Sequence, residues 1–235
     1  MGVIQPYCTD EDLVLRASAD FVAIVPRDQV LARATDGSFA GDPWTLTSAS
    51  SNFETAGITP GMVCHLIKPI AVFRPPGDLL AIASSTDGLF LRRKGLEAGA
   101  GLPPGGGGTT GVEFAVVSAV PQIRLASYDL NRRFGVDDLV TGRRFSDLWD
   151  VAELREATVL LTLIGLYLDA SRGTGDVLLA GGGAGSRPDV FLTKSRTLSA
   201  ELNELLGRVV IHWRSVTPTG PSADNTTKFG CRIVR

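Results

Sequence analysis

Apolar residues recur along the chain in helical and strand-like patterns, and the longest run predicts a helix around which the rest of the protein packs. Val151 to Ala170 contains no proline, and its apolar positions continue for about five helical turns. Asp150 precedes the run as a candidate N-cap, with Glu153 at the spacing of a capping box. From Ala157 onward apolar residues cover every direction around the helix axis, so we expect burial in the subunit's own core or in a subunit interface. We therefore expect Leu161→Asp to abolish soluble folding.

Two shorter helices are predicted near the start of the chain. Tyr7 to Ala19 has Thr9 and Asp12 at the spacing of a capping box, followed by apolar residues that a short helix can bury on one side. Pro26 stands at a position that suits the first turn of a second helix over Arg27 to Ala32. The helical pattern then stops at a Thr-Asp-Gly sequence, which is typical of a turn.

From about Asp42 to Ala126 the pattern changes to short strand-like runs separated by glycine and proline. The Asp-Gly pair at 87–88 suits a tight hairpin between two of these runs. Gly99 to Gly111 has few side chains to bury, so we expect a mobile loop that folding does not need. The predicted strands are Trp44 to Thr47, Met62 to Ile67, Leu79 to Ala83, Leu89 to Arg92 and Val112 to Val120.

After Gln122 the helical pattern returns. Tyr128 to Phe134 predicts a short helix that precedes the long central one. Thr197 to Leu206 predicts a further helix whose leucines form one apolar stripe, with Gly207 as its end. Arg208 to Trp213 predicts a strand.

The last part of the chain, residues 217–235, is rich in proline, glycine and small polar residues, and it ends in apolar residues. Such a composition cannot form a core, so we expect an arm that a partner orders. The apolar end alternates like a strand and can pair with the exposed edge of a neighbouring subunit. The alternative is that the arm folds back beside Arg208 to Trp213 in its own subunit. The candidate partner-binding residues of the arm are Phe229, Cys231, Ile233 and Val234.

These patterns together predict an α+β fold: a helical core, an inserted small β-sheet or barrel module, and an extended C-terminal arm. The predicted parts are residues 1–35 as the N-terminal part of the helical core, 36–126 as the β module with its glycine-rich loop, 127–216 as the rest of the helical core, and 217–235 as the arm.

Composition and charge narrow the classes of function. The chain has 235 residues, of which 44% are hydrophobic and 20% charged, so it can bury a real core. A formal net charge of −2 gives no overall attraction to a phosphate backbone. Cys8, Cys64 and Cys231 are far apart and odd in number, which predicts free thiols in a reducing compartment. The first residues lack a secretory pattern, and the uninterrupted apolar part of the central helix is too short to cross a bilayer. We expect a protein that is made and used in the cytoplasm or in a particle assembled there, without a membrane span.

No motif predicts catalytic chemistry. Cys64 and His65 are adjacent, but successive side chains of a strand point to opposite faces, so we expect a core cysteine and a surface histidine. With His212 in another predicted strand, no local spacing supplies the three ligands of a metal site. Gly181 to Ser186 is glycine-rich but lacks the Gly-Lys-Ser/Thr ending of a phosphate-binding loop. We predict no catalytic, cofactor-binding or metal site. The alternative from another class is a hydrolase whose site is assembled from His65, His212 and distant acids.

Two passages resemble the neck proteins of tailed bacteriophages, the head-to-tail adaptors that dock as a ring beneath the portal. Tyr7 to Leu13, YCTDEDL, is similar to the tyrosine, small residue, threonine, acidic, leucine start of the first adaptor helix. Ser51 to Val63, SNFETAGITPGMV, resembles a recurrent phage phrase in which a phenylalanine, an Ala-Gly and a Pro-Gly-Asp precede a strand. Here Met62 stands where aspartate is usual.

The resemblance implies a structural virion protein rather than an enzyme. It implies helices that pack into a ring, a projecting β module, and an arm that reaches a neighbour. The implied partners are the portal protein, other neck and tail proteins, copies of the chain itself, and transient, non-specific contact with packaged DNA, without a membrane or a cofactor. The implied location is the virion neck, assembled in the host cytoplasm. A head-closure or tail-terminator protein of the same neck is the nearest alternative.

Overall fold

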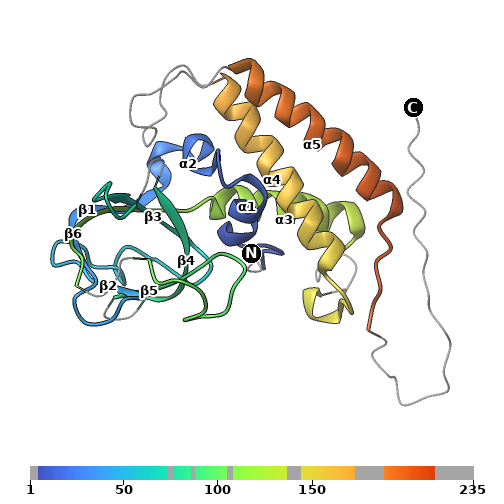
Figure 1. The fold of residues 1–235 in the computed structure, drawn as a ribbon. Coiled ribbons are helices and arrows are strands. Elements are labelled where there is room, and N and C mark those ends of the chain that lie inside the picture. The colour runs from blue at the N-terminus through green and yellow to red at the C-terminus, as the bar shows by residue number, and fades with distance from the viewer. Residues whose placement is uncertain are drawn as a thin grey trace, which may run out of the picture.

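A computed structural model describes residues 5–73, 77–85, 88–104, 108–136, 144–172 and 188–214. Within these ranges the chain forms five α-helices and one six-stranded antiparallel sheet, so the predicted α+β class is confirmed (Figure 1). Helices precede and follow the strands along the chain, as predicted. The elements are α1 (Asp10–Ala17), α2 (Phe21–Ile24), η1 (Arg27–Gln29), β1 (Val30–Ser38), β2 (Thr45–Leu46), β3 (Val63–Lys68), β4 (Asp78–Ser85), β5 (Leu89–Arg92), β6 (Thr110–Val117), α3 (Val120–Phe134), η2 (Phe145–Asp147), α4 (Ala152–Arg172) and α5 (Pro188–Arg208).

The sheet has the strand order β1-β6-β3-β4-β5-β2 and curls until its two edges nearly meet. Ser38, at the end of β1, donates its N–H to Thr47 O at 2.8 Å and accepts one from Thr47 N at 2.9 Å. Beside this bridge the Asp36 carboxylate accepts hydrogen bonds from the Ser48 hydroxyl and from Ser50 N, which lower the pKa of Asp36 to about 2. The module is therefore a nearly closed small barrel.

Strand β3 lies between the barrel interior and the helices, and so it is buried on both faces. Cys64 and Leu66 belong to the barrel core, whereas Val63 belongs to the cluster beneath the helices. The prediction that Cys64 and His65 point to opposite faces is confirmed by this alternation. The expected surface histidine is wrong, because His65 is only 3% exposed. The helices cover the face of β3 that a sheet alone would leave to solvent.

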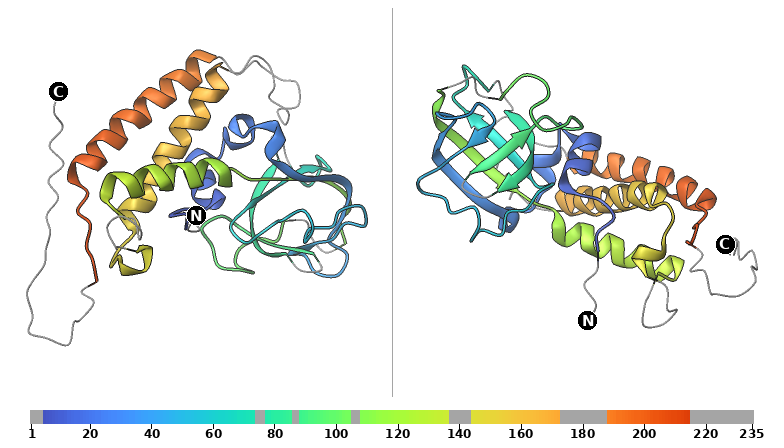
Figure 2. Two further views of the ribbon diagram at one scale, coloured as in Figure 1. Left: turned by 180° about the vertical axis from the view of Figure 1, so that it is seen from behind. Right: turned by 90° about the horizontal axis from the view of Figure 1, so that it is seen from below.

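The predicted central helix is confirmed as α4, which packs against α5, α3, α2 and α1 (Figure 2). Ala152 N donates to Asp150 Oδ1 at 2.8 Å, so Asp150 caps the start of the helix. Glu153 makes a different contact from the predicted one, because its carboxylate accepts a hydrogen bond from Val210 N. Leu161 is only partly buried, so the apolar residues of α4 do not all face the core.

The predicted helix over Arg27 to Ala32 is wrong in its second half. Arg27–Gln29 forms one 3₁₀ turn, and β1 begins at Val30, which pairs with Val117 of β6. Such a short apolar run suits either a helix or a strand, and pairing with a distant strand decides between them. The predicted part boundaries at 35/36 and 126/127 fall inside β1 and inside α3.

Five further predictions differ from the structure, four of them at their ends and one, the strand over 208–213, along its whole length. Strand β6 stops at Val117, and α3 already begins at Val120, eight residues before the helix that the sequence predicted. Helix α5 begins at Pro188 rather than Thr197. The strand predicted over Arg208 to Trp213 is wrong, because Arg208 ends α5 and the segment makes only one isolated bridge, between Leu148 and Trp213. Of the predicted loop over 99–111, the last two residues belong to β6 and residues 105–107 lie outside the described ranges.

The C-terminal arm also lies outside the described residues, and so does the glycine-rich segment 181–186. The predictions for Phe229, Cys231, Ile233 and Val234 therefore stay predictions.

Candidate functional site

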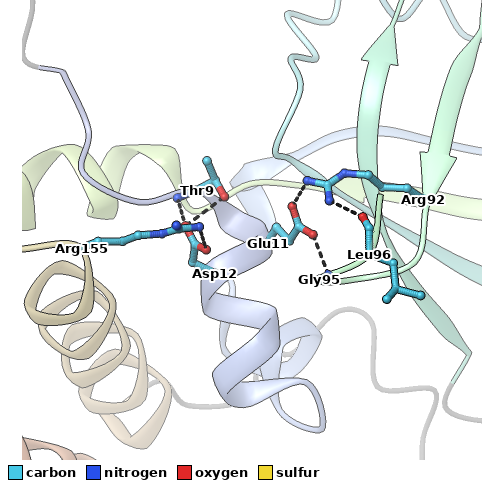
Figure 3. A network of polar contacts seen from close by, with 7 residues as sticks. All are labelled: Thr9, Glu11, Asp12, Arg92, Gly95, Leu96 and Arg155. Carbon is cyan, nitrogen blue, oxygen red and sulfur yellow. Dashed lines mark hydrogen bonds and ion pairs between the residues drawn. The ribbon is translucent and has the colours of Figure 1, made fainter. Parts of the chain in front are cut away.

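The first turn of α1 is the point where the barrel and the helices are joined (Figure 3). Thr9 N donates to Asp12 Oδ2 at 2.8 Å, so the predicted capping box forms and fixes where α1 begins. Three consecutive acidic residues follow Thr9, and their carboxylates contact three different parts of the structure. Negative charge at a helix N-terminus is favourable, but each carboxylate also makes a specific long-range contact.

The Glu11 carboxylate connects α1 to the barrel. Its Oε2 pairs with the Arg92 guanidinium at the end of β5, and its Oε1 accepts the Gly95 N–H at 2.9 Å. The same guanidinium donates to Leu96 O at 2.8 Å, which holds the loop after β5 in place. The Glu11 side chain is 8% exposed, so this ion pair is largely removed from water.

The neighbouring carboxylates connect α1 to the other helices. Asp12 pairs with Arg155 in the first turn of α4. Asp10 Oδ1 accepts the Ala119 N–H at 2.7 Å, at the junction between β6 and α3. One helical turn therefore contacts the barrel, the β6–α3 junction and α4. We call Asp10, Glu11, Asp12, Arg92, Ala119 and Arg155 the α1 joint.

Asp10 is the most deeply buried charged residue of the α1 joint. Its side chain is almost completely buried, and burial raises the pKa of Asp10 to about 6, although hydrogen bonds from Ala119 N and the Ser118 hydroxyl oppose the shift. Asp10 Oδ2 is buried and has no hydrogen-bond partner. The ionised form is therefore tolerated at a cost.

Asp10→Asn is expected to make the protein relatively more stable at high pH. The pKa of Asp10 is higher in the folded than in the unfolded protein, so protonated Asp10 contributes to the free energy of unfolding. This contribution is complete below the unfolded pKa of about 4 and is lost as pH rises through about 6. The asparagine variant has no such loss. Between pH 4 and pH 8 its free energy of unfolding should gain about 3 kcal/mol relative to wild type. Urea unfolding of both proteins at each pH measures this, and a difference that does not change with pH would contradict it.

The two passages that resemble phage neck proteins contact each other at the α1 joint. Glu11 N donates to Gly61 O at 3.1 Å, so the loop before β3 meets the first turn of α1. Gly61 has a φ of +89°, and a Cβ at this position would lie 2.9 Å from Thr9 Cγ2. Both the backbone conformation and the close approach to Thr9 require glycine here.

A cavity of about 510 Å³ lies between α2 and the barrel. His65, Asp78, Arg93 and Lys94 contribute its polar lining. Arg93 pairs with Asp78 at 3.0 Å, and burial lowers the pKa of Lys94. Gly77 has a φ of +99° and backs onto the His65 ring, where a Cβ would lie 2.5 Å from Nε2. The cavity is large enough to hold a small polar molecule.

The structure separates the residues of the alternative hydrolase site. His65 lies in β3 of the barrel, whereas His212 follows α5, where its carbonyl accepts the Trp149 N–H at 2.8 Å. Figure 1 shows the segment that follows α5 well apart from β3. Cys8 and Cys64 are free buried thiols, and burial raises the pKa of both.

Neither a metal-binding cluster nor a membrane-spanning helix is found in the described ranges. There, no group of three or more His, Cys, Asp or Glu side chains is arranged to hold a metal ion. Across the same ranges no helix combines the length and the apolar character that a bilayer crossing requires.

Sequence reasoning found only part of the α1 joint. It identified Asp12 through its capping-box spacing from Thr9, but it assigned no role to Asp10 or Glu11. The available signal was the run of three acids in one helical turn, which local chemistry explains as helix-dipole stabilisation. Their partners lie 80 or more residues away in the chain, so no local spacing could reveal them.

The fold and the α1 joint define a mixed helix-and-sheet protein in which a nearly closed antiparallel barrel is fastened to a helical core. No protein-family model, no curated protein and no solved structure matches this chain.

Proposed function

We propose that this protein is a head-to-tail adaptor, a structural virion protein that forms a ring below the portal in a phage neck. In that role it joins capsid to tail and contributes to the conduit for DNA. Its partners are the portal protein, other neck and tail proteins and further copies of the chain, with only transient, non-specific contact with packaged DNA. It needs no cofactor and performs no catalysis.

The main support for this proposal is the contact between the two passages that resemble phage neck proteins. Tyr7 to Leu13 and Ser51 to Val63 are separated along the chain, yet the hydrogen bond from Glu11 N to Gly61 O joins them. Two unrelated chance similarities have no reason to meet in one packed joint. A shared structural unit explains both the residue types and their contact.

The exposed surface of the helical part also supports an assembly role. Large hydrophobic side chains reach solvent on different helices and loops, among them Leu125 and Tyr128 of α3 and Trp149 before α4. Leu125 and Tyr128 are neighbours on α3, and aromatic side chains are enriched at protein interaction surfaces.

Native mass spectrometry with purified portal rings from the phage that encodes the chain tests the proposal. The full chain should add to the portal ring in a fixed number of copies. A chain that lacks residues 217–235 should keep the thermal stability of the full chain and fail to join, if the arm binds a neighbour. Failure of the full chain to bind portal rings would contradict the adaptor role.

The same experiment distinguishes the adaptor role from its nearest alternative. A head-closure or tail-terminator protein should ignore the bare portal and bind only a portal that already carries an adaptor ring, or the end of the tail. The hydrolase alternative predicts activity without any partner, and the separation of His65 from His212 does not favour it.

A further inference from the structure

One side of α3 forms an exposed ridge. Ile123, Ala126 and Leu130 face the core, and at about 100° per residue the opposite side of the helix carries the residues of the ridge. Leu125 is 63% and Tyr128 43% exposed. We call this surface the α3 ridge, and it consists of Pro121, Arg124, Leu125, Tyr128 and Arg132.

The α3 ridge is positively charged around its apolar centre. The Arg132 guanidinium lies over the Tyr128 ring, 5.8 Å from its centroid. Arg124, Arg132 and the adjacent Arg133 form no ion pair within the described part of the chain, and Asp129 is the one acidic residue of α3. The surface therefore offers an exposed aromatic and an aliphatic side chain among arginines that outnumber the one acid of α3.

A groove of the opposite character lies between α1 and the start of α4. It has a volume of about 560 Å³ and an apolar lining that includes Leu15, Val151 and Val159. We call it the α1–α4 groove. Leu15 is 54% exposed, so the apolar lining is open to solvent.

The α1–α4 groove carries net negative charge. Its two cations are already neutralised, since Arg155 pairs with Asp12 and Arg16 pairs with Glu201. Asp150 and Glu156 also line the groove, and neither forms an ion pair with any residue that the structure describes.

The two surfaces lie on different elements, the ridge on the exposed side of α3 and the groove between α1 and the start of α4. Helix α4 passes in front of α3 in Figure 1, and α3 covers α4 and α1 when the molecule is seen from behind (Figure 2). The α3 ridge points away from α4, because the residues that α3 buries lie on its other side. One subunit thus presents an apolar basic ridge and a separate apolar acidic groove.

We propose that the α3 ridge of one copy docks into the α1–α4 groove of the next copy. Leu125 and Tyr128 pack on the apolar lining, and Arg124 and Arg132 lie against the acidic side chains of the groove. The two surfaces differ, so each copy uses one for each neighbour, and repetition builds a ring or a filament. This inference rests on the proposed function in that it names the contact between ring neighbours, but the physical argument needs only the two surfaces.

Two variants of the full chain separate the two surfaces. The ridge variant is Leu125→Ser with Arg132→Glu, and the groove variant is Leu15→Ser with Glu156→Arg. All four positions are exposed, so both variants should keep the wild-type circular dichroism spectrum and melting temperature. Arg196→Glu, at an exposed position on α5, is the control for charge reversal.

Sedimentation velocity over a concentration series gives the readout. Wild type and Arg196→Glu should associate as concentration rises, whereas each double variant alone should remain monomeric. An equal mixture of the ridge and groove variants should form dimers and stop there, because only one intact ridge and one intact groove meet. Arg132→Glu and Glu156→Arg combined in one chain should restore association, since the charges are then exchanged.

Three outcomes would overturn the proposal. They are a wild-type chain that is monomeric at its highest soluble concentration, a double variant that associates like wild type, and a mixture that stays monomeric. Variants that keep self-association but no longer join portal rings would assign these surfaces to the portal instead. Conversely, a wild-type chain that associates through these surfaces and ignores the portal would keep this inference and reject the adaptor role.

Discussion

Leu163→Asp should prevent the protein from folding. Leu163 lies in the middle of α4, is completely buried, and belongs to the cluster that joins α1, α2, α4 and the barrel. The substitution removes a buried leucine, which alone costs about 2–5 kcal/mol, and adds a carboxylate without a partner in an apolar environment. The sum is comparable with a total stability of about 5–15 kcal/mol. Far-UV circular dichroism and solubility on expression measure the outcome.

Leu161→Asp is the matched comparison. Leu161 is only partly buried, so its carboxylate can reach water, and the structure corrects the expectation that this substitution abolishes folding. We expect a cost of about 1–2 kcal/mol and a folded protein. If the Leu163→Asp variant cannot be isolated, Leu163→Ala gives a free energy of unfolding that can be measured. Equal damage from Leu161→Asp and Leu163→Asp would mean that both faces of α4 are buried.

Glu11→Ala should cost about 3 kcal/mol of unfolding free energy. The substitution leaves the Arg92 guanidinium, which is 27% exposed, without its carboxylate, and it leaves Gly95 N–H without its acceptor. Removing one partner of a buried ion pair costs about 3–5 kcal/mol, and the partial exposure of Arg92 keeps the value at the lower end. Urea unfolding of the variant and of wild type, each with a single transition, measures this difference in the free energy of unfolding.

Glu201→Ala is the control for Glu11→Ala. Glu201 pairs α5 with Arg16 of α1, but both side chains are more than a third exposed. Such a pair contributes about 0–1 kcal/mol. Arg92→Ala combined with Glu11→Ala should cost less than the sum of the single variants, because the two residues share one interaction. If Glu11→Ala were no more damaging than Glu201→Ala, the α1 joint would not hold the barrel.

Local chemistry was enough to predict the elements whose signals lie close together in the chain. The helix predicted over 151–170 follows from a long apolar pattern without proline and from Asp150 before it, and the structure forms it over 152–172. Thr9 and Asp12 mark the start of α1 through contacts three residues apart. The hairpin of β4 and β5 follows from two strand-like runs separated by an Asp-Gly pair. The opposite directions of Cys64 and His65 follow from strand alternation. These features depend on backbone periodicity, which a short window of sequence contains.

Long-range contacts decided the rest. Val30 continues into a strand because β6, more than 70 residues later, offers it a partner, although the local run suits a helix equally well. His65 is buried because helices from another part of the chain cover β3. The joint formed by Glu11 and Arg92, and the separation of the α3 ridge from the α1–α4 groove, arise only when distant elements pack. A sequence pattern indicates which face of an element is apolar, but the element that covers this face depends on the free energy of the whole packed structure.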